Sequence, residues 1–354
     1  MELKYTDPDP FNHGTATVTY KSMPEEEAFL LIPVLQKGWG EENCKFSNLY
    51  KGNEKNGNNF RADAGSVSYV LKKSRINEPE SQKLVNECIA YLKGKSVPVP
   101  EIIPTLNGST FYEEGRDIFC LYGFIGGENF DGSGDELENV AVGIGRLHKA
   151  LENLPYKDEV KKLKGEVIRH DRELLENISK KLRENGERTE FDSYVLGILD
   201  EIDECSREIG GAEIDGLPFQ AVHYDLHPHN VLFNGESKEV LAFLDFDPLC
   251  YSQRARDVGF GMHRFARTYG EKTERKLDVG AGLNDRANLF LKAYIETNQI
   301  KDEEIKALPL LIQDEAIRRV IIILDNHYFK NDTTWSFDLG KQVTTLREGK
   351  LFHF

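Results

Sequence analysis

Hydrophobic residues recur with two different spacings along the chain, and the spacing changes near residue 123. Before that point, short apolar or alternating runs predict strands, interrupted by a turn at Gly38 and Gly40 and by a loop over 52–64. The predicted strands cover 15–20, a run starting at residue 29, 46–51, 67–72, 110–112 and 118–122. One helix is predicted over 82–93, where apolar residues recur every three or four positions.

After residue 123 the helical spacing dominates. Ser133 and Glu136 form a capping box that predicts the start of a helix. Further helices are predicted within 157–210 and over most of the chain after residue 257, notably 285–297, 303–311 and 313–328. The exception is a predicted β-hairpin, in which the turn 234–237 separates two apolar runs.

These patterns together predict an α+β protein with two lobes. We expect a β-rich N-terminal lobe over 1–122, in which 1–25 form an irregular extension, and a mainly helical C-terminal lobe over 123–354. A glycine-containing hinge is expected near 122–126.

Composition narrows the class of partner. The net charge of −15 argues against nucleic acid and against anionic membrane surfaces as partners. Five separated cysteines without a C-x-x-C pair are typical of a reducing compartment. The start of the chain is charged, and its apolar runs are far shorter than the ~20 residues of a membrane span, so we expect a cytoplasmic protein. The oligomeric state stays open.

Polar residues gather where the predicted hairpin begins and ends. Asn230 directly precedes its first apolar run, and Asp245 directly follows the second. Because a hairpin brings its ends together, these two side chains should lie close to each other, and such oxygen ligands suit an Mg²⁺ ion that also holds phosphate oxygens. Asp225, on the loop that leads in, suits a base that orients a hydroxyl group for phosphoryl transfer.

The histidines of the same loop allow a second interpretation. His223, His227 and His229 could belong to a metal-dependent hydrolase, because zinc sites use histidine and aspartate. No distant histidine or cysteine pair completes such a site, so the sequence favours phosphoryl transfer.

The loop resembles the motif of the aminoglycoside phosphotransferase and choline kinase superfamily, which has a protein-kinase-like fold. The resemblance covers about 29–328 and rests on a set of matched residues, His223, Asp225, Leu226, His227, Pro228, Asn230, Leu244, Asp245, Phe246, Asp247 and Asp257. Similarity to homoserine-kinase-like and N-acetylhexosamine-kinase-like members is also visible. The resemblance implies that Asp225 is the base, that Asn230 and Asp245 bind the metal, and that His223 and Asp257 brace the loop.

For the nucleotide, the resemblance implies ATP bound between the lobes. Lys72 would contact its phosphates, with Glu87 as the partner of that lysine. Gly38 and Gly40 would form the turn over the phosphates, although they match the protein-kinase glycine loop poorly. The adenine would lie against the hinge backbone, formed by Leu121, Tyr122 and Gly123.

On the acceptor side the chain departs from its family. Tyr224 and His229 replace glycines of the family pattern and would reshape the substrate edge of the loop, where Asp247 and Arg264 are further candidates. We expect an ATP- and Mg²⁺-dependent kinase of a small molecule, with a sugar or amino-sugar hydroxyl as the acceptor. Amino alcohols such as homoserine or choline, aminoglycosides, and a catalytically inactive nucleotide-binding module remain alternatives.

Overall fold

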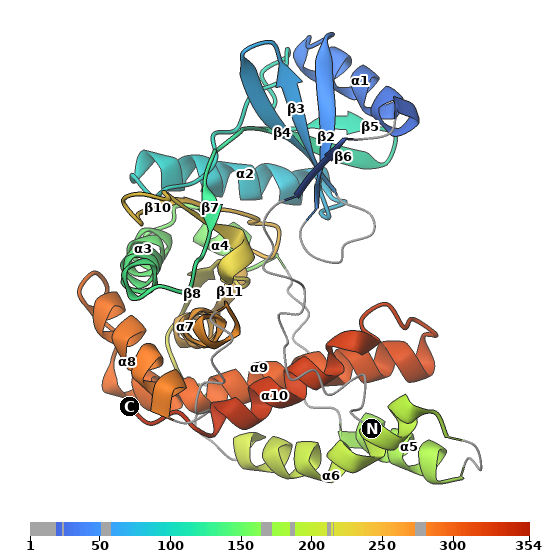
Figure 1. The fold of residues 1–354 in the computed structure, drawn as a ribbon, viewed down its shortest axis with the longest axis vertical. Coiled ribbons are helices and arrows are strands. Elements are labelled where there is room, and N and C mark those ends of the chain that lie inside the picture. Colours follow the sequence, from blue (N-terminus) through green and yellow to red (C-terminus); the bar gives the residue numbers. More distant parts are fainter. Residues whose placement is uncertain are drawn as a thin grey trace.

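The computed structural model describes residues 19–22, 25–50, 58–163, 172–184, 188–210, 214, 216–272 and 281–354. A β-sheet with two helices forms one part of the molecule, and a mainly helical part lies beneath it (Figure 1). This arrangement confirms the predicted fold class.

The N-terminal part is built around an antiparallel sheet with the strand order β1-β2-β3-β4-β6-β5. Helix α2 crosses the space between the sheet and the helical part (Figure 1). The elements are β1 (Thr19–Ser22), α1 (Glu25–Trp39), β2 (Cys44–Tyr50), β3 (Asn59–Ala64), β4 (Val67–Lys73), α2 (Pro79–Gly94), β5 (Tyr112–Glu114) and β6 (Asp117–Gly123).

The apolar run that starts at residue 29 is a helix, so the predicted strand there is wrong. It has one buried face, formed by Leu31, Val34, Leu35 and Trp39. That spacing of three, four and eight residues follows the helical period, and the face packs on the sheet beside Phe46 and Leu71. Trp39 also anchors the helix end, since its indole N–H donates to the carbonyl of Ile103 at 2.9 Å.

The predicted loop over 52–64 is also partly wrong, because β3 occupies its second half. Ala62 alone among the six residues of β3 is fully buried, so the strand lacks a hydrophobic pattern and depends on backbone pairing with β2 and β4. Residues 51–57 lie outside the described part of the chain, as do 15–18 of the predicted first strand and most of the predicted extension.

The C-terminal part contains two small sheets among helices, with strand orders β10-β9-β7 and β11-β8. The predicted hairpin is confirmed as β9 and β10, whose Phe243 lies opposite Val231. The elements are β7 (Glu128–Asn129), α3 (Gly134–Glu152), α4 (Lys157–Val160), α5 (Arg172–Glu184), α6 (Glu190–Gly210), β8 (Phe219–Val222), η1 (Pro228–Asn230), β9 (Val231–Phe233), β10 (Val240–Phe243), β11 (Cys250–Gln253), α7 (Arg254–Lys272), α8 (Ala281–Ile295), α9 (Asp302–Phe329), η2 (Ser336–Asp338) and α10 (Leu339–Gly349).

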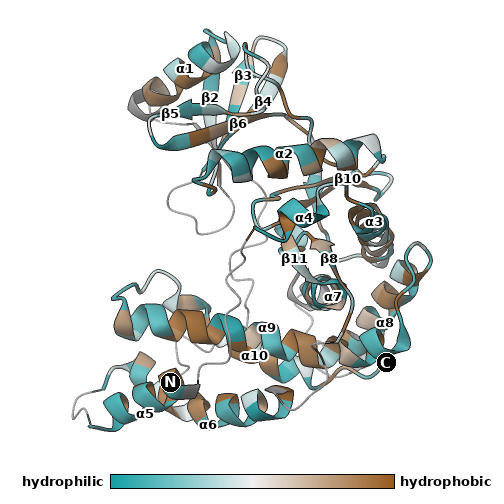
Figure 2. Cartoon of the chain, turned by 180° about the vertical axis from the view of Figure 1, so that it is seen from behind, coloured by the Kyte–Doolittle hydropathy of each residue, from teal (hydrophilic) through white to brown (hydrophobic). Residues whose placement is uncertain are grey.

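Helix α9 organises the helical part. The two helices predicted over 303–328 are one helix of 28 residues, which contains Pro309 and continues past it. It packs against α6, α7 and α10, and its apolar middle stretch is visible in Figure 2. Among the described residues, none of the helices combines the length and hydrophobicity needed to cross a membrane.

The chain passes from the sheet to the helical part after Gly123, where β6 ends. The next strand, β7, pairs with β9 of the C-terminal part. The division of the lobes between residues 122 and 123 stays a prediction, and this strand exchange is compatible with it.

Candidate active site

The loop between β8 and η1 is fixed by a buried carboxylate in the first turn of α7. Asp257, which is 1% exposed, accepts hydrogen bonds from the backbone N–H groups of His223 and Tyr224, both at 3.0 Å. His148 Nε2 lies 3.1 Å from the same carboxylate. Three donors compensate the cost of burying this charge. The position of Asp257 is therefore the one that the resemblance implies.

His223 connects this loop to the segment after β10. The backbone N–H of Asp225 donates to its Nδ1 at 3.3 Å, and its Nε2 lies 2.9 Å from the carbonyl oxygen of Leu244. Because Nδ1 accepts, we assign the proton to Nε2, which then donates to Leu244. Both ring nitrogens are engaged in bracing. In the part of the chain that the structure describes, no group of three or more His, Cys, Asp or Glu side chains could hold a metal ion.

Asp225 lies on this braced loop with its side chain 24% exposed. Asn230 Nδ2 donates to both its Oδ2 and its backbone oxygen at 3.0 Å, and His227 Nε2 lies 3.4 Å from Oδ2. Although burial works to raise it, the charges of His227 and Arg319 hold the pKa of Asp225 below its usual range. The carboxylate is ionised at neutral pH and can accept the proton of a hydroxyl group.

Asn230 and Asp245 stand side by side, as the hairpin predicts. The backbone N–H of Leu244 donates to the carbonyl oxygen of Asn230 at 2.8 Å, which places Asp245 next to it. Since Asn230 Nδ2 binds Asp225, its Oδ1 is the atom that it can offer to a metal. Asp245, at φ +62°, already holds a cation, because Lys72 Nζ lies 2.7 Å from its Oδ1. These donors fit Mg²⁺, which keeps several waters.

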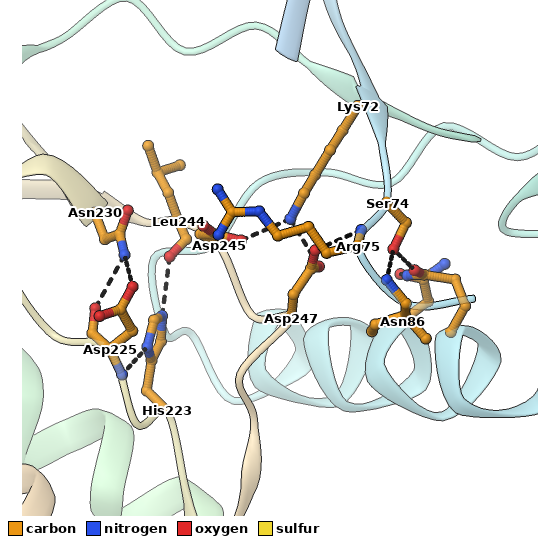
Figure 3. A network of polar contacts seen from close by, with 12 residues as sticks. Lys72, Ser74, Arg75, Asn86, His223, Asp225, Asn230, Leu244, Asp245 and Asp247 are labelled. Carbon is orange, nitrogen blue, oxygen red and sulfur yellow. Dashed lines mark hydrogen bonds and ion pairs between the residues drawn. The ribbon is translucent and has the colours of Figure 1, made fainter. Parts of the chain in front are cut away.

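Lys72 extends from β4 toward the C-terminal part and joins two carboxylates there (Figure 3). Its Nζ lies 2.7 Å from Asp245 Oδ1 and 2.7 Å from Asp247 Oδ1, and its side chain is 10% exposed. Although burial works to lower it, the two carboxylates hold the pKa of Lys72 above its usual value. Asp247 binds Lys72 and the backbone N–H of Arg75, and its predicted role toward the substrate stays a prediction.

The predicted pairing of Lys72 with Glu87 is wrong. The face of α2 that is buried beside β4 carries Gln82 and Asn86, and Gln82 Oε1 accepts a hydrogen bond from Ser74 at 2.5 Å. Glu87 follows Asn86 by one residue, which turns it about 100° around the helix from that face. Lys72 pairs with Asp245 and Asp247, which follow β10, in place of Glu87.

A cavity of about 980 Å³, including its open mouth, lies between the two parts of the molecule. Tyr122 and Gly123 line it, as predicted for the adenine site, whereas Leu121 is fully buried within the sheet. The other lining residues come from both parts and include Lys72 and Asp245, namely Leu49, Asn59, Val70, Lys72, Ile89, Pro100, Phe124, Ile125, Gly127, Leu232, Leu244, Asp245 and Phe246.

Gly38 and Gly40 do not line this cavity, so the predicted phosphate turn is wrong. Gly38 is in the last turn of α1, where an added Cβ would lie 3.1 Å from the Tyr112 ring. Gly40, at φ +76°, is the left-handed residue that follows the helix. Leu49 of β2 and Asn59 of β3 line the cavity instead, and residues 51–57 between them lie outside the described part.

On the acceptor side, Tyr224 has a left-handed backbone at φ +69°, a conformation that favours glycine. Its hydroxyl donates to Glu315 at 3.3 Å, and Arg319 Nε donates to the same carboxylate at 3.0 Å. Glu315 and Arg319 were not predicted as site residues; two adjacent arginines inside an apolar helix were the available signal. His229 lies with its ring 5.4 Å from that of His227.

The sequence profile of the Phosphotransferase enzyme family (APH) matches residues 51–289. This range contains the whole braced loop, Lys72 and the hairpin. The chain belongs to this family. Its protein-kinase-like fold agrees with the arrangement described above, and alcohol-acceptor kinase chemistry agrees with the geometry around Asp225.

Solved structures of small-molecule kinases share the fold of this phosphotransferase family member. Spectinomycin phosphotransferase, in complex with ADP and spectinomycin, is 17% identical with a TM-score of 0.66, and the match covers 91% of this chain and 97% of that one. Amicoumacin kinase, in complex with AMP-PNP, Ca²⁺ and its substrate, is 18% identical with a TM-score of 0.61, covering 92% of each chain. An aminoglycoside phosphotransferase from Alicyclobacillus acidocaldarius is 16% identical with a TM-score of 0.63, covering 84% of this chain and 89% of that one.

Curated relatives match over a shorter segment. The homoserine kinase of Parvibaculum lavamentivorans is 26% identical over 132 residues, which is 37% of this chain and 37% of the relative. That of Rhizobium johnstonii is 30% identical over 122 residues, which is 34% of this chain and 35% of the relative. The match thus spans about a third of the length of these relatives.

Proposed function

We propose that the protein transfers the γ-phosphoryl group of ATP to a hydroxyl group of a small molecule. The observation that carries this proposal is that Lys72 and Asp245 meet at the cavity between the lobes. Asn230 lies next to Asp245, and its amide group holds Asp225. Phosphoryl transfer needs positioning and charge neutralisation more than covalent chemistry, and this set supplies both.

Asp225 acts as the base in this proposal. Its carboxylate accepts a hydrogen bond from the acceptor hydroxyl and takes that proton while the oxygen bonds to the γ-phosphorus and the bond to ADP breaks. The hydrogen bonds from Asn230 and His227 hold the carboxylate in one orientation. His223 and Asp257 act through the loop backbone and are positioning residues.

Lys72 serves the nucleotide phosphates, and Asn230 and Asp245 would hold the divalent metal. Held by Asn230 and Asp245, Mg²⁺ would supply positive charge to the phosphate oxygens. The nucleotide and Ca²⁺ in the complex of amicoumacin kinase support the use of a nucleotide and a divalent ion. Lys72 also pairs with Asp245, whose Oδ1 lies 2.7 Å from its Nζ.

For the acceptor we propose a sugar or amino-sugar derivative, with a homoserine-type hydroxyl compound as the second candidate. The first is supported by the spectinomycin and aminoglycoside phosphotransferases that share the fold. The second is supported by the homoserine kinases whose sequences match about a third of the chain.

The test is a phosphorylation assay with ATP, Mg²⁺ and a panel of sugars, amino sugars, amino alcohols and hydroxy amino acids. We expect one acceptor class to yield a phosphorylated product, with Asp225→Asn reducing the rate at least a hundredfold. Stabilisation by ATP and Mg²⁺ without phosphorylation of any acceptor would contradict the proposal and identify a nucleotide-binding module instead.

A further inference from the structure

Three basic side chains from three helices lie near one another, and one of them, Arg319, also acts on the charge of Asp225. They are Arg264 of α7, Arg319 of α9 and Lys341 of α10, and we call them the basic wall. Helix α7 lies directly under the catalytic loop, since a Cβ added at Gly261 would be 3.4 Å from the Leu226 side chain.

Arg319 connects the wall to the loop. Tyr224, next to Asp225, donates its hydroxyl to Glu315 at 3.3 Å, and Glu315 accepts from Arg319 Nε at 3.0 Å. Arg319 also lies close enough to Asp225 to stabilise its negative charge. An acceptor whose hydroxyl group meets Asp225 would therefore have Arg319 within reach.

The guanidinium of Arg319 retains donors for a ligand. Among the described residues, its hydrogen bonds go to Glu315 alone and use Nε, so that the terminal amino groups make none. The Phe260 ring supports the group from one side at 4.7 Å, and one third of the side chain is exposed. A planar guanidinium held in this way can bind a carboxylate with two parallel hydrogen bonds.

Lys341 adds a second cation that is only partly compensated. Its Nζ lies 3.1 Å from Asp338 Oδ1, and its side chain is 16% exposed. Burial and the nearby charge of Arg264 lower the pKa of Lys341 to about 8, despite Asp338. A bound anion would stabilise the charged lysine.

The charge of the wall indicates the kind of anion. Arg319 is paired with Glu315 and also faces the charges of Asp225 and Asp338, while Lys341 is paired with Asp338. The acidic neighbours neutralise most of the positive charge of the basic wall. The charge that is left suits a ligand with one negative charge better than a phosphate group with two, so a carboxylate is the better match.

We propose that the basic wall binds a carboxylate of the acceptor, so that the acceptor is a hydroxy acid, such as a sugar acid or a hydroxy amino acid. The proposal rests on the proposed function. It excludes neutral sugars and simple amino alcohols as good acceptors, because they would leave the terminal amino groups of Arg319 without a partner.

The acceptor panel tests this when it is arranged in pairs that differ by one carboxylate. Suitable pairs are homoserine with 3-aminopropan-1-ol and glucuronic acid with glucose, and any other acceptor found is compared with its amide or decarboxylated analogue. We expect the acid to have at least tenfold higher kcat/KM. Arg319→Gln and Lys341→Gln should raise KM for the acid at least tenfold and leave KM for ATP within threefold. Arg347→Gln, which removes the same charge from an exposed ion pair on α10, is the control.

Each outcome separates the two proposals. A neutral member that is phosphorylated as well as its acid, or a preference for the acid that survives both substitutions, would overturn the carboxylate site and leave the kinase function intact. Absence of phosphorylation with every acceptor, while nucleotide still binds, would overturn the kinase function and the carboxylate site with it. Thermal melting checks folding, and Lys341→Gln carries the test if Arg319→Gln does not fold.

Discussion

At the scale of single residues, Asp257 determines the shape of the catalytic loop. Its carboxylate accepts from two backbone N–H groups and contacts His148. In Asp257→Asn, an amide NH₂ group would face one of these donors, so a buried hydrogen bond is lost. We expect the free energy of unfolding to fall by about 2 to 3 kcal/mol in chemical denaturation. Asp325→Asn, at an exposed pair with Lys330, should change it by less than about 0.5 kcal/mol; equal losses would contradict this role.

Lys72 and Lys73 are adjacent in β4, but Lys72 forms ion pairs in the interior and Lys73 forms one at the surface. Lys72 compensates Asp245 and Asp247, so Lys72→Met leaves two partly buried carboxylates without their cation, and we expect a loss of about 2 to 3 kcal/mol in the free energy of unfolding. Lys73 pairs with Asp117 at the surface, and Lys73→Met should cost less than about 1 kcal/mol. Urea denaturation measures the free energy of unfolding of both variants. Similar losses would contradict the interior ion pair of Lys72 with Asp245 and Asp247.

At the scale of helices, replacing two glycines by alanine should change stability in opposite directions. Gly145 lies where α3 meets α8, and an added Cβ would be 3.0 Å from the backbone oxygen of Tyr294 and collide with Thr297. Gly197 of α6 has nothing within 4 Å of that position. We expect Gly145→Ala to destabilise the protein by about 1 to 3 kcal/mol and Gly197→Ala to stabilise it by about 0.5 to 1 kcal/mol, measured by denaturation. A stabilising Gly145→Ala would contradict the close packing of α3 on α8.

The start of α3 should make stability depend on pH. Burial, together with the neighbouring carboxylate of Asp131, raises the pKa of Glu136 to about 7, although Lys238 lies 3.4 Å away. A raised folded-state pKa means that the folded protein binds more protons than the unfolded one between about pH 4.5 and 7. The contribution of this group is therefore present below that window and is lost as the pH rises through it.

Glu136→Gln tests this dependence. The wild type should lose about 2 kcal/mol in its free energy of unfolding relative to the variant between pH 5 and pH 8. Exposed Glu138 of the same helix supplies the control, because Glu138→Gln removes a carboxyl group from the solvated face of α3. A constant difference for Glu136→Gln would contradict the raised pKa.

Sequence patterns predicted these elements unevenly, for physical reasons. The hairpin and α2 carry a clear period, and the loop from His223 to Asn230 carries its chemistry in consecutive residues, so both the elements and the site could be predicted. Helix α1 and strand β3 could not, because one has a short apolar run that fits either period and the other has only Ala62 buried. Contacts between distant segments, such as Lys72 with Asp247, depend on side-chain direction and have no local signal.

At the scale of the whole molecule, the function depends on bringing two lobes together at one cavity. Lys72 comes from the sheet, and Asp245 comes from the segment after β10 in the C-terminal part (Figure 3). Asp225, the base in the proposed function, lies on a loop whose shape depends on α7. Nucleotide binding and chemistry are therefore assigned to different residues and can be separated by substitution.

The rate of a single turnover measures this separation most directly. The assay uses saturating ATP and Mg²⁺ with the acceptor that the protein phosphorylates. We expect Asp225→Asn to lower the rate of phosphoryl transfer at least a hundredfold while the Kd for ATP stays within threefold. A rate that survives the substitution would contradict the assignment of Asp225 as the base and, with it, the kinase mechanism derived from this loop.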